Sequence, residues 1–189
     1  MNTENKNSKN SVEMLVIDLL IALLAIAADQ LSKIQIRATL PIGAGTDLIP
    51  GVLQFLHHEN SGASWGVMKG QTVFLLVITV VVVVAITGFL IKLPAEKKYL
   101  PMNIAGALVW AGALGNAIDR VDKKTVTDFI YFVPINFPIF NVADIFIVVA
   151  TISMLVLFLF FYKEDDFRFL EKADKKAENA SDDKSPEED

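Results

Sequence analysis

The sequence predicts a membrane-embedded all-α bundle of four transmembrane helices with a small extracytoplasmic β-cradle. Hydrophobic residues make up 53% of the 189-residue chain, which is above their usual share in a soluble domain. Four apolar stretches are each close to the roughly 20 residues that a helix needs to cross a bilayer. Between the first two stretches, Pro50-Gly51 separates two short β-prone runs, a pattern typical of a turn between strands.

The four predicted spans are Ser11 to Ala28, Gln71 to Ile91, Pro101 to Ile118 and Ile139 to Tyr162. The second is the clearest, because five valines follow one another in it without a charged residue. In the third, small residues recur at every fourth position, at Ala107, Ala111 and Gly115. Such a stripe lets helix backbones approach closely in lipid, and we therefore expect this span to lie centrally in the bundle.

The first span has an alternative interpretation as a cleavable secretory signal peptide. Lys6 and Lys9 precede an apolar run that ends in Ala25-Ile26-Ala27, which is the order of regions in such a peptide. A retained signal-anchor accounts better for the sequence, because three further spans follow and polar residues come directly after Ala28.

The remaining segments are polar or interrupted by prolines. We expect residues 1–10 to be a cytoplasmic N-terminal segment, and residues 11–162 to form the membrane domain, with the outer β-cradle over about 37–70. Residues 129–140 are aromatic but contain Pro134 and Pro138, so they should lie along the membrane interface instead of crossing it. Residues 163–189 should be a disordered, acidic cytoplasmic tail.

Lys and Arg near the span ends predict the orientation. With the N-terminus in the cytoplasm, the inner segments hold ten of these bases and the outer segments six. This difference predicts that the N-terminus and the C-terminus both lie in the cytoplasm.

Composition excludes several classes of function. Residues 163–189 hold eleven Asp and Glu against six Lys and Arg, which accounts for the formal charge of −5; the rest of the chain is neutral, so no basic surface for nucleic acid is predicted. The absence of cysteine excludes thiolate nucleophiles and disulfides. His57 and His58 lack further ligands at metal spacing and should be solvated loop residues. We expect neither a metal nor a cofactor, and the sequence makes no prediction of an oligomeric state.

Ionisable and amide side chains gather at the predicted outer ends of three spans. Charged groups are costly in membrane segments, so each is a candidate for function. Four separate regions of the chain bring such groups to one depth: Asp29 and Lys33; Asn116, Asp119 and Arg120; Asp128; Asn141 and Asp144.

Asp128 and Asp144 are the candidate catalytic residues. The third and fourth spans are consecutive and antiparallel, so the two carboxyl groups can meet at one depth. Two close carboxyl groups that share one proton can act as base and acid, as in aspartic proteases. The ionised group would take a proton from water as it attacks a peptide carbonyl, and the protonated group would bond the carbonyl oxygen.

Structural roles remain open for several of these residues. Asp29 and Lys33 could form an i,i+4 ion pair that fixes a helix end at the headgroups, and Arg120 could extend to the interface. Asn141 and Asp144 could cap the fourth span. A small proton-coupled transporter, with Asp18 in a proton relay, is the alternative function; it predicts polar residues through the midplane, which spans two and four lack. No role for Asp18 itself follows from the sequence.

The chain resembles bacterial signal peptidase II, the lipoprotein signal peptidase. The resemblance covers about Ser11 to Tyr162 and rests on five blocks: Asp29-Gln30-Leu31-Ser32-Lys33, Asn60-Ser61-Gly62-Ala63-Ser64-Trp65, Ala111-Gly112-Ala113-Leu114-Gly115-Asn116 with Asp119-Arg120, Val126-Thr127-Asp128-Phe129, and Phe140-Asn141-Val142-Ala143-Asp144. Ala111 and Trp65 stand where the family commonly has Gly and Phe.

The resemblance implies an aspartic endopeptidase of the bacterial cytoplasmic membrane with its active site at the outer face. Its substrate would be a diacylglyceryl-modified prolipoprotein, held in membrane lipid and cut before the lipidated cysteine, and globomycin-type inhibitors would bind. Asp128 and Asp144 would be catalytic. Substrate would be bound by Asn60, Gly62, Asn116, Arg120 and Asn141, and the site would be supported by Asp29, Lys33 and Asp119.

Overall fold

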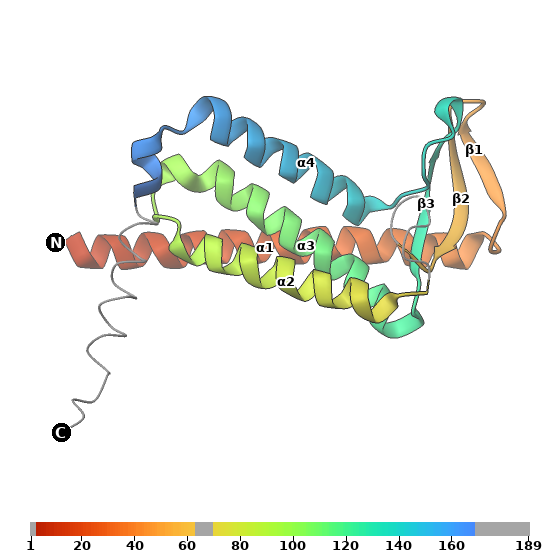
Figure 1. Cartoon of the computed structure of the whole chain (residues 1–189), viewed down its shortest axis with the longest axis horizontal. Coiled ribbons are helices and arrows are strands. Elements are labelled where there is room, and N and C mark those ends of the chain that lie inside the picture. The colour runs from red at the N-terminus through yellow and green to blue at the C-terminus, as the bar shows by residue number, and fades with distance from the viewer. Residues whose placement is uncertain (1–2, 63–69, 169–189) are drawn as a thin grey trace, which may run out of the picture.

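The described residues form four long helices, which lie side by side with a small sheet across one end of them (Figure 1). The structure is a computed structural model that describes the backbone of residues 3–62 and 70–168 and the side chains of residues 11–62 and 70–168. The helices are α1 (Thr3–Thr39), α2 (Thr72–Lys92), α3 (Leu100–Lys123) and α4 (Val142–Val156), and the strands are β1 (Gly45–Ile49), β2 (Leu53–Asn60) and β3 (Val126–Phe132). Shorter helical segments are η2 (Lys97–Tyr99), η3 (Val133–Ile135), η4 (Leu157–Phe161) and η5 (Glu164–Phe167).

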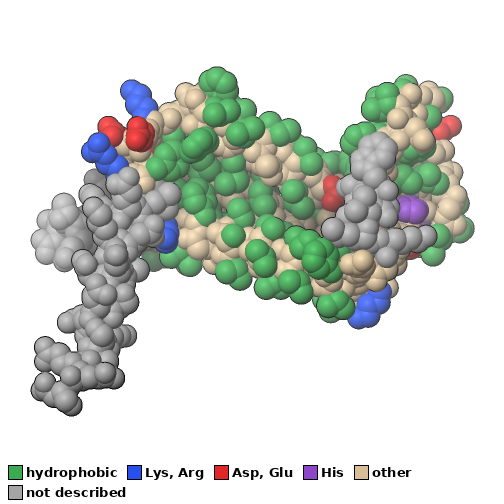
Figure 2. Space-filling view, viewed as in Figure 1, with side chains coloured by type: hydrophobic (Ala, Val, Ile, Leu, Met, Phe, Trp, Pro, Cys, Tyr) green, Lys and Arg blue, Asp and Glu red, His purple; other side chains and the backbone are tan. Residues whose placement is uncertain are grey.

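Three helical stretches of the described residues are long and apolar enough to cross a membrane: Ser11–Thr39, Thr72–Lys92 and Val142–Phe161. Their large side chains face outward, as at Leu24 and Val73, which are 70% and 75% exposed. Figure 2 shows this apolar surface over the middle of the bundle, with the charged side chains on the visible face near its two ends. The exposed hydrophobic surface is suited to contact with lipid tails.

Helix α3 is less apolar because it is buried by the other three helices. It packs against α1, α2 and α4, as its stripe of small residues predicts, and Ala107 and Ala111 are 2% and 1% exposed. A Cβ on Gly112 would lie 2.6 Å from the carbonyl oxygen of Ala143, and one on Gly115 would lie 2.6 Å from Asp29 Oδ2. These two glycines allow α1 and α4 to approach α3 closely.

Helix α1 is longer than the sequence predicts. The expected span ends at Ala28, but no glycine or proline follows until Pro41, so the helix continues to Thr39. Asp29 and Lys33 therefore lie within the helix instead of after it. At its other end the helix begins at Thr3, so it includes most of the segment expected to precede the membrane domain.

The sheet contains two strands from the outer segment over about 37–70 and a third strand, β3, from a later part of the chain. The strands pair antiparallel in the order β1-β2-β3, and β1 and β2 confirm the predicted hairpin around Pro50-Gly51. The first part of residues 129–140 forms a strand that the sequence did not predict, since β3 pairs with β2 and aligns Asp128 with His58. The β-branched and aromatic residues of Val126–Phe132 favour a strand, and Pro134 then lies in η3.

The end of the bundle opposite the sheet is closed by aromatic packing. Tyr99 and Tyr162 stack with their ring centroids 5.5 Å apart, and Phe167 packs against this cluster. The described chain therefore remains folded through η5, a few residues beyond the predicted boundary at residue 163.

We expect the close contact at Gly112 to be essential for stability. Gly112→Ala should lower the melting temperature of the purified protein by several degrees, since overpacking costs about 1–3 kcal/mol, and it should lower activity because the displaced Ala143 adjoins Asp144. Gly88→Ala in α2 is the matched control, because a Cβ there meets no described atom within 4 Å. Equal melting temperatures of the two variants would contradict this packing.

Candidate active site

A buried ammonium group joins α1 to α3 at the base of the sheet. Lys33 Nζ lies 2.9 Å from Asp29 Oδ2 and 3.3 Å from Asp119 Oδ2, and it donates to Asn116 Oδ1 at 3.1 Å. The Lys33 side chain is 0% exposed and that of Asp29 is 1% exposed. The i,i+4 ion pair of the alternative structural role is therefore present, and it is buried inside the fold.

The two acids around Lys33 extend this connection to the elements that carry Asp128 and Asp144. Asp29 Oδ1 accepts the backbone N–H of Ala143 in α4 at 3.0 Å. Asp119 Oδ2 accepts the backbone N–H of Thr127 in β3 at 3.1 Å. Each acid thus fixes the residue next to a candidate catalytic aspartate.

Asn141 and Asp144 form a capping box at the start of α4. The Asn141 side chain accepts the N–H of Asp144 at 3.0 Å, and Asp144 Oδ2 accepts the N–H of Asn141 at 3.1 Å. The predicted capping role is confirmed. The same Asn141 side chain also donates to Asp128 Oδ1 at 2.7 Å, so capping does not exclude a role in the site.

The two candidate catalytic carboxyl groups are connected through asparagine side chains. Asp128 accepts from Asn141 and, at 2.8 Å through Oδ2, from Asn60. Asp144 Oδ1 accepts from Asn116 Nδ2 at 2.8 Å. Asn116 and Asn141 also bond each other at 3.0 Å. Neutral amides therefore hold the carboxyl groups that β3 and α4 contribute.

The surroundings of Asp128 favour its protonated form. Burial raises the pKa of Asp128 to about 7, and the neighbouring Asp144 carboxyl adds to the rise, while the hydrogen bonds from Asn60 and Asn141 oppose it. A carboxyl group with a pKa near neutrality can hold or release a proton at physiological pH, as general acid–base chemistry requires.

Gly62 and Arg120 lie at the edge of this group of side chains. The Gly62 N–H donates to Asn60 Oδ1 at 2.9 Å, and Arg120 donates through Nη2 to the Gly62 carbonyl at 3.4 Å. The structure therefore brings together all ten residues that the sequence singles out. Residues 63–69, which include part of the block ending in Trp65, lie outside the described residues.

A second set of contacts, not predicted from the sequence, holds β3 from β2 and α1. Glu59 accepts hydrogen bonds from Thr125, Thr127 and His57, and Arg37 donates to Thr127 Oγ1 at 2.9 Å. The prediction for His57 is wrong: it is 4% exposed because it points inward from β2, whereas His58 is exposed. Strand alternation in Leu53–Asn60 was the signal that could have shown this.

The described residues contain no group of three or more His, Asp or Glu that could hold a metal ion. The arrangement instead offers two carboxyl groups, three amide side chains and one guanidinium group at the junction of the helices and the sheet. Its chemistry is that of proton transfer and of hydrogen bonding to a peptide.

Comparison with known proteins gives one consistent result. A family model described as "Signal peptidase (SPase) II" matches residues 21–161. The chain is 38% identical over 144 residues to the lipoprotein signal peptidases of Staphylococcus aureus strains MRSA252 and JH9, covering 75% of this chain and 86% of each relative. A solved structure described as "Bacterial membrane enzyme structure by the in meso method at 2.3 A resolution" is 35% identical with a TM-score of 0.69, covering 78% of this chain and 92% of that one. A second, at 1.9 Å, is 35% identical with a TM-score of 0.67 and covers 77% and 94%.

We expect removal of the buried ammonium to unfold the site. Lys33→Met leaves Asp29 as a buried acid without a cation and leaves Asp119 with only Arg37, 3.7 Å away. Breaking a buried pair costs about 3–5 kcal/mol. Thermal unfolding of purified protein should therefore show a large drop in melting temperature.

The matched control is Lys98→Met, which removes an ion pair to Asp166 from a lysine that is 42% exposed. Little change is expected there, because exposed pairs contribute little. A Lys33→Met protein as stable as the Lys98→Met protein would show that the buried network does not hold the fold together.

Proposed function

We infer that this chain, which belongs to the signal peptidase II family and removes signal peptides from prolipoproteins, is an aspartic protease whose catalytic pair is Asp128 and Asp144. The observation that carries the inference is the bridging by Asn141, which bonds both carboxyl groups, one through its side chain and one through its backbone. The comparisons give no support to the transporter alternative.

In the proposed reaction the pair shares one proton. Asp144, as the ionised member, takes a proton from a water molecule while the water oxygen attacks the scissile carbonyl carbon. Asp128, which holds the shared proton near neutral pH, donates it to the carbonyl oxygen. The carbon–nitrogen bond then breaks, the proton taken up by Asp144 passes to the leaving amine, and one hydroxyl of the tetrahedral intermediate returns its proton to Asp128. The new carboxyl group remains on the signal peptide, and the pair again holds one proton.

The surrounding polar groups support binding of an extended peptide beside the pair. Asn60, Asn116 and Asn141 keep both carboxyl groups in place. Arg120 and Gly62 lie next to them, where they would contact the substrate backbone. We propose that the substrate cysteine carries diacylglycerol, because the apolar helix surface ends where the sheet begins, so lipid chains beside the helices would hold the scissile bond at the depth of the carboxyl groups. Globomycin-type inhibitors would occupy the same space.

We propose that all four helices span the cytoplasmic membrane and that both termini are cytoplasmic. Helix α3 lies between α1, α2 and α4 and is long enough to cross with them. The start of α1 and the segment η5 lie at the end opposite the sheet (Figure 1), which agrees with the excess of Lys and Arg on the inner segments. The acidic residues after η5 would then be a cytoplasmic tail. Because the chain lacks cysteine, single cysteines at Lys123 and Lys97 test this topology: an impermeant thiol reagent should label only the first in intact cells.

Replacing either Asp128 or Asp144 with Asn should abolish cleavage of a diacylglyceryl-modified prolipoprotein. Asn keeps the shape but cannot carry the shared proton. The double variant should be scarcely less active than either single one, since groups that act as one unit are not additive. Globomycin binding and melting temperature should be retained, which separates lost chemistry from lost structure.

The matched control is Asp122→Asn, which changes an exposed acid on α3 and should leave cleavage unchanged. Substantial turnover by folded Asp128→Asn or Asp144→Asn protein would refute the aspartic mechanism, although the peptidase function would stand.

The pH dependence of kcat/KM should show a descending limb near pH 7. Asp128 loses its proton as the pH rises through its pKa of about 7, so the singly protonated pair is lost above that pH. Asn60→Leu removes a hydrogen bond that lowers this pKa, so the limb should move to higher pH.

Gln54→Leu, in the same strand but bonded to Asp47, is the control and should leave the limb in place. A limb that stays fixed or moves to lower pH in Asn60→Leu would rule out Asp128 as the group responsible.

A further inference from the structure

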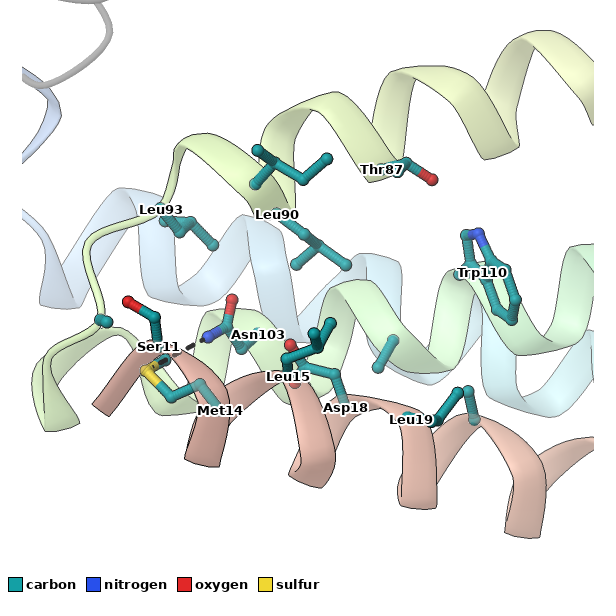
Figure 3. Close-up of a pocket in the computed structure, with 14 residues that line it drawn as sticks. Ser11, Met14, Leu15, Asp18, Leu19, Thr87, Leu90, Leu93, Asn103 and Trp110 are labelled. Carbon is teal, nitrogen blue, oxygen red and sulfur yellow. Dashed lines mark hydrogen bonds between the residues drawn. The ribbon is translucent and has the colours of Figure 1, made fainter. Parts of the chain in front are cut away.

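A cavity separate from the candidate active site lies near the end of the bundle opposite the sheet, between α1, α2 and α3 (Figure 3). Its volume is about 410 Å³, within the roughly 300–1,000 Å³ of known ligand pockets. The walls are mostly apolar and include Leu15, Leu90 and Trp110. Figure 3 shows Asp18 and Asn103 extending from α1 and α3 into the same space.

Two residues that line this cavity each carry a buried oxygen atom that has no hydrogen-bond donor among the described residues. The atoms are Asp18 Oδ1 and Asn103 Oδ1. Asn103 is only 3% exposed, and its amide nitrogen is directed at Met14 Sδ, 3.8 Å away. Burying an unpaired polar oxygen costs free energy, and such atoms normally have a partner. The two oxygens therefore indicate a ligand that supplies N–H or O–H donors.

The ligand is not the peptide that occupies the catalytic site. Asn103 precedes Asn116 by thirteen residues in α3, which places it about 20 Å away along the axis and about 140° around the helix. The cavity therefore opens on a different face of α3 from the one that carries the catalytic amides. A ligand of this cavity would therefore be a separate molecule.

The position of the cavity indicates a lipid. Asn103 lies three residues into α3, or about 5 Å along the axis from Leu100, and Lys97, Lys98 and Tyr99 precede that residue, as is typical of a membrane interface. A head group at this interface would lie beside the two residues that carry these oxygens, while its chain lies along Leu19, Ala22 and Trp110. The negative charge of Asp18 favours a cationic head, and a primary ammonium group supplies three donors.

We propose that this cavity binds a phospholipid with a primary-amine head group, whose ammonium donates to Asp18 and Asn103. The bound lipid fills the space between α1 and α2 and stabilises the fold. The site is independent of the catalytic assignment, so either can fail without the other.

Thermal unfolding of the full chain in detergent tests this site. The probes are dioleoyl phosphatidylethanolamine and dioleoyl phosphatidylcholine, which share chains and charge but differ in that the second has no N–H donor. At saturating lipid, the amine lipid should raise the melting temperature by about 5 °C or more beyond the choline lipid, since a bound ligand stabilises by mass action. Free ethanolamine should have no such effect, which separates a lipid site from an amine site.

Variants of the cavity residues test whether Asp18 and Asn103 cause the additional rise in melting temperature. Asp18→Leu and Asn103→Leu should each remove the excess, which is the rise in melting temperature with the amine lipid beyond that with the choline lipid. Thr87→Val is the matched control: Thr87 lines the same cavity, but its hydroxyl bonds Val83 within α2 at 2.7 Å, so the excess should remain. Native mass spectrometry of bound lipid gives a second measurement that is independent of changes in baseline stability. Equal effects of the two lipids, or an excess that persists in both leucine variants, would overturn the proposal.

Discussion

The neutralisation of the Lys33 ammonium is the constraint on which the rest of the structure depends. An unpaired cation at 0% exposure is too costly to bury, so α1 and α3 must bring Asp29 and Asp119 against it. Asp29 accepts a backbone N–H of α4 through its other oxygen, and Asp119 accepts one of β3 through the same oxygen that faces Lys33. The sheet, the bundle and the two candidate catalytic carboxyl groups are therefore placed relative to one another by one charged group and its partners.

Close to this charged centre, the candidate catalytic pair is held by neutral groups. Asn60, Asn116 and Asn141 donate to the carboxyl groups without adding a formal charge. Lysine or arginine at these positions would bond the same oxygens but would strongly favour the ionised forms. Amides fix the geometry and leave the pKa of Asp128 near neutrality, which suits a pair that shares a proton. The amides thus separate the Lys33 ammonium from Asp128 and Asp144. This arrangement both fixes the carboxyl groups and preserves the protonation that the proposed reaction needs.

Much of this arrangement could be predicted from the sequence, for identifiable reasons. Spans two and four follow from their length and apolarity, and α3 was placed centrally from its small residues. Most side chains of the site could be singled out because polar groups near membrane spans are rare, whereas Asn60 and Gly62 were implied only by the family resemblance. The extension of α1 past Ala28 was missed because a hydropathy pattern ends where polar residues begin, even when those residues face a buried partner. The strand β3 was missed because its partner, β2, is about seventy residues earlier in the chain. The contacts of Glu59 with Thr125 and Thr127 depend on that same pairing, so local sequence could not reveal them.

The capping box at the start of α4 has a consequence for drug resistance under the proposed mechanism. The carboxyl group of Asp144 would perform chemistry while one of its oxygens holds the backbone of Asn141, and Asn141 reaches Asp128 in turn. A change at either position would alter both the helix start and the catalytic pair, because a longer acid such as Glu would misplace its oxygens for both tasks. An inhibitor that derives its affinity from these two residues would therefore leave the bacterium few viable escape mutations at its contact points.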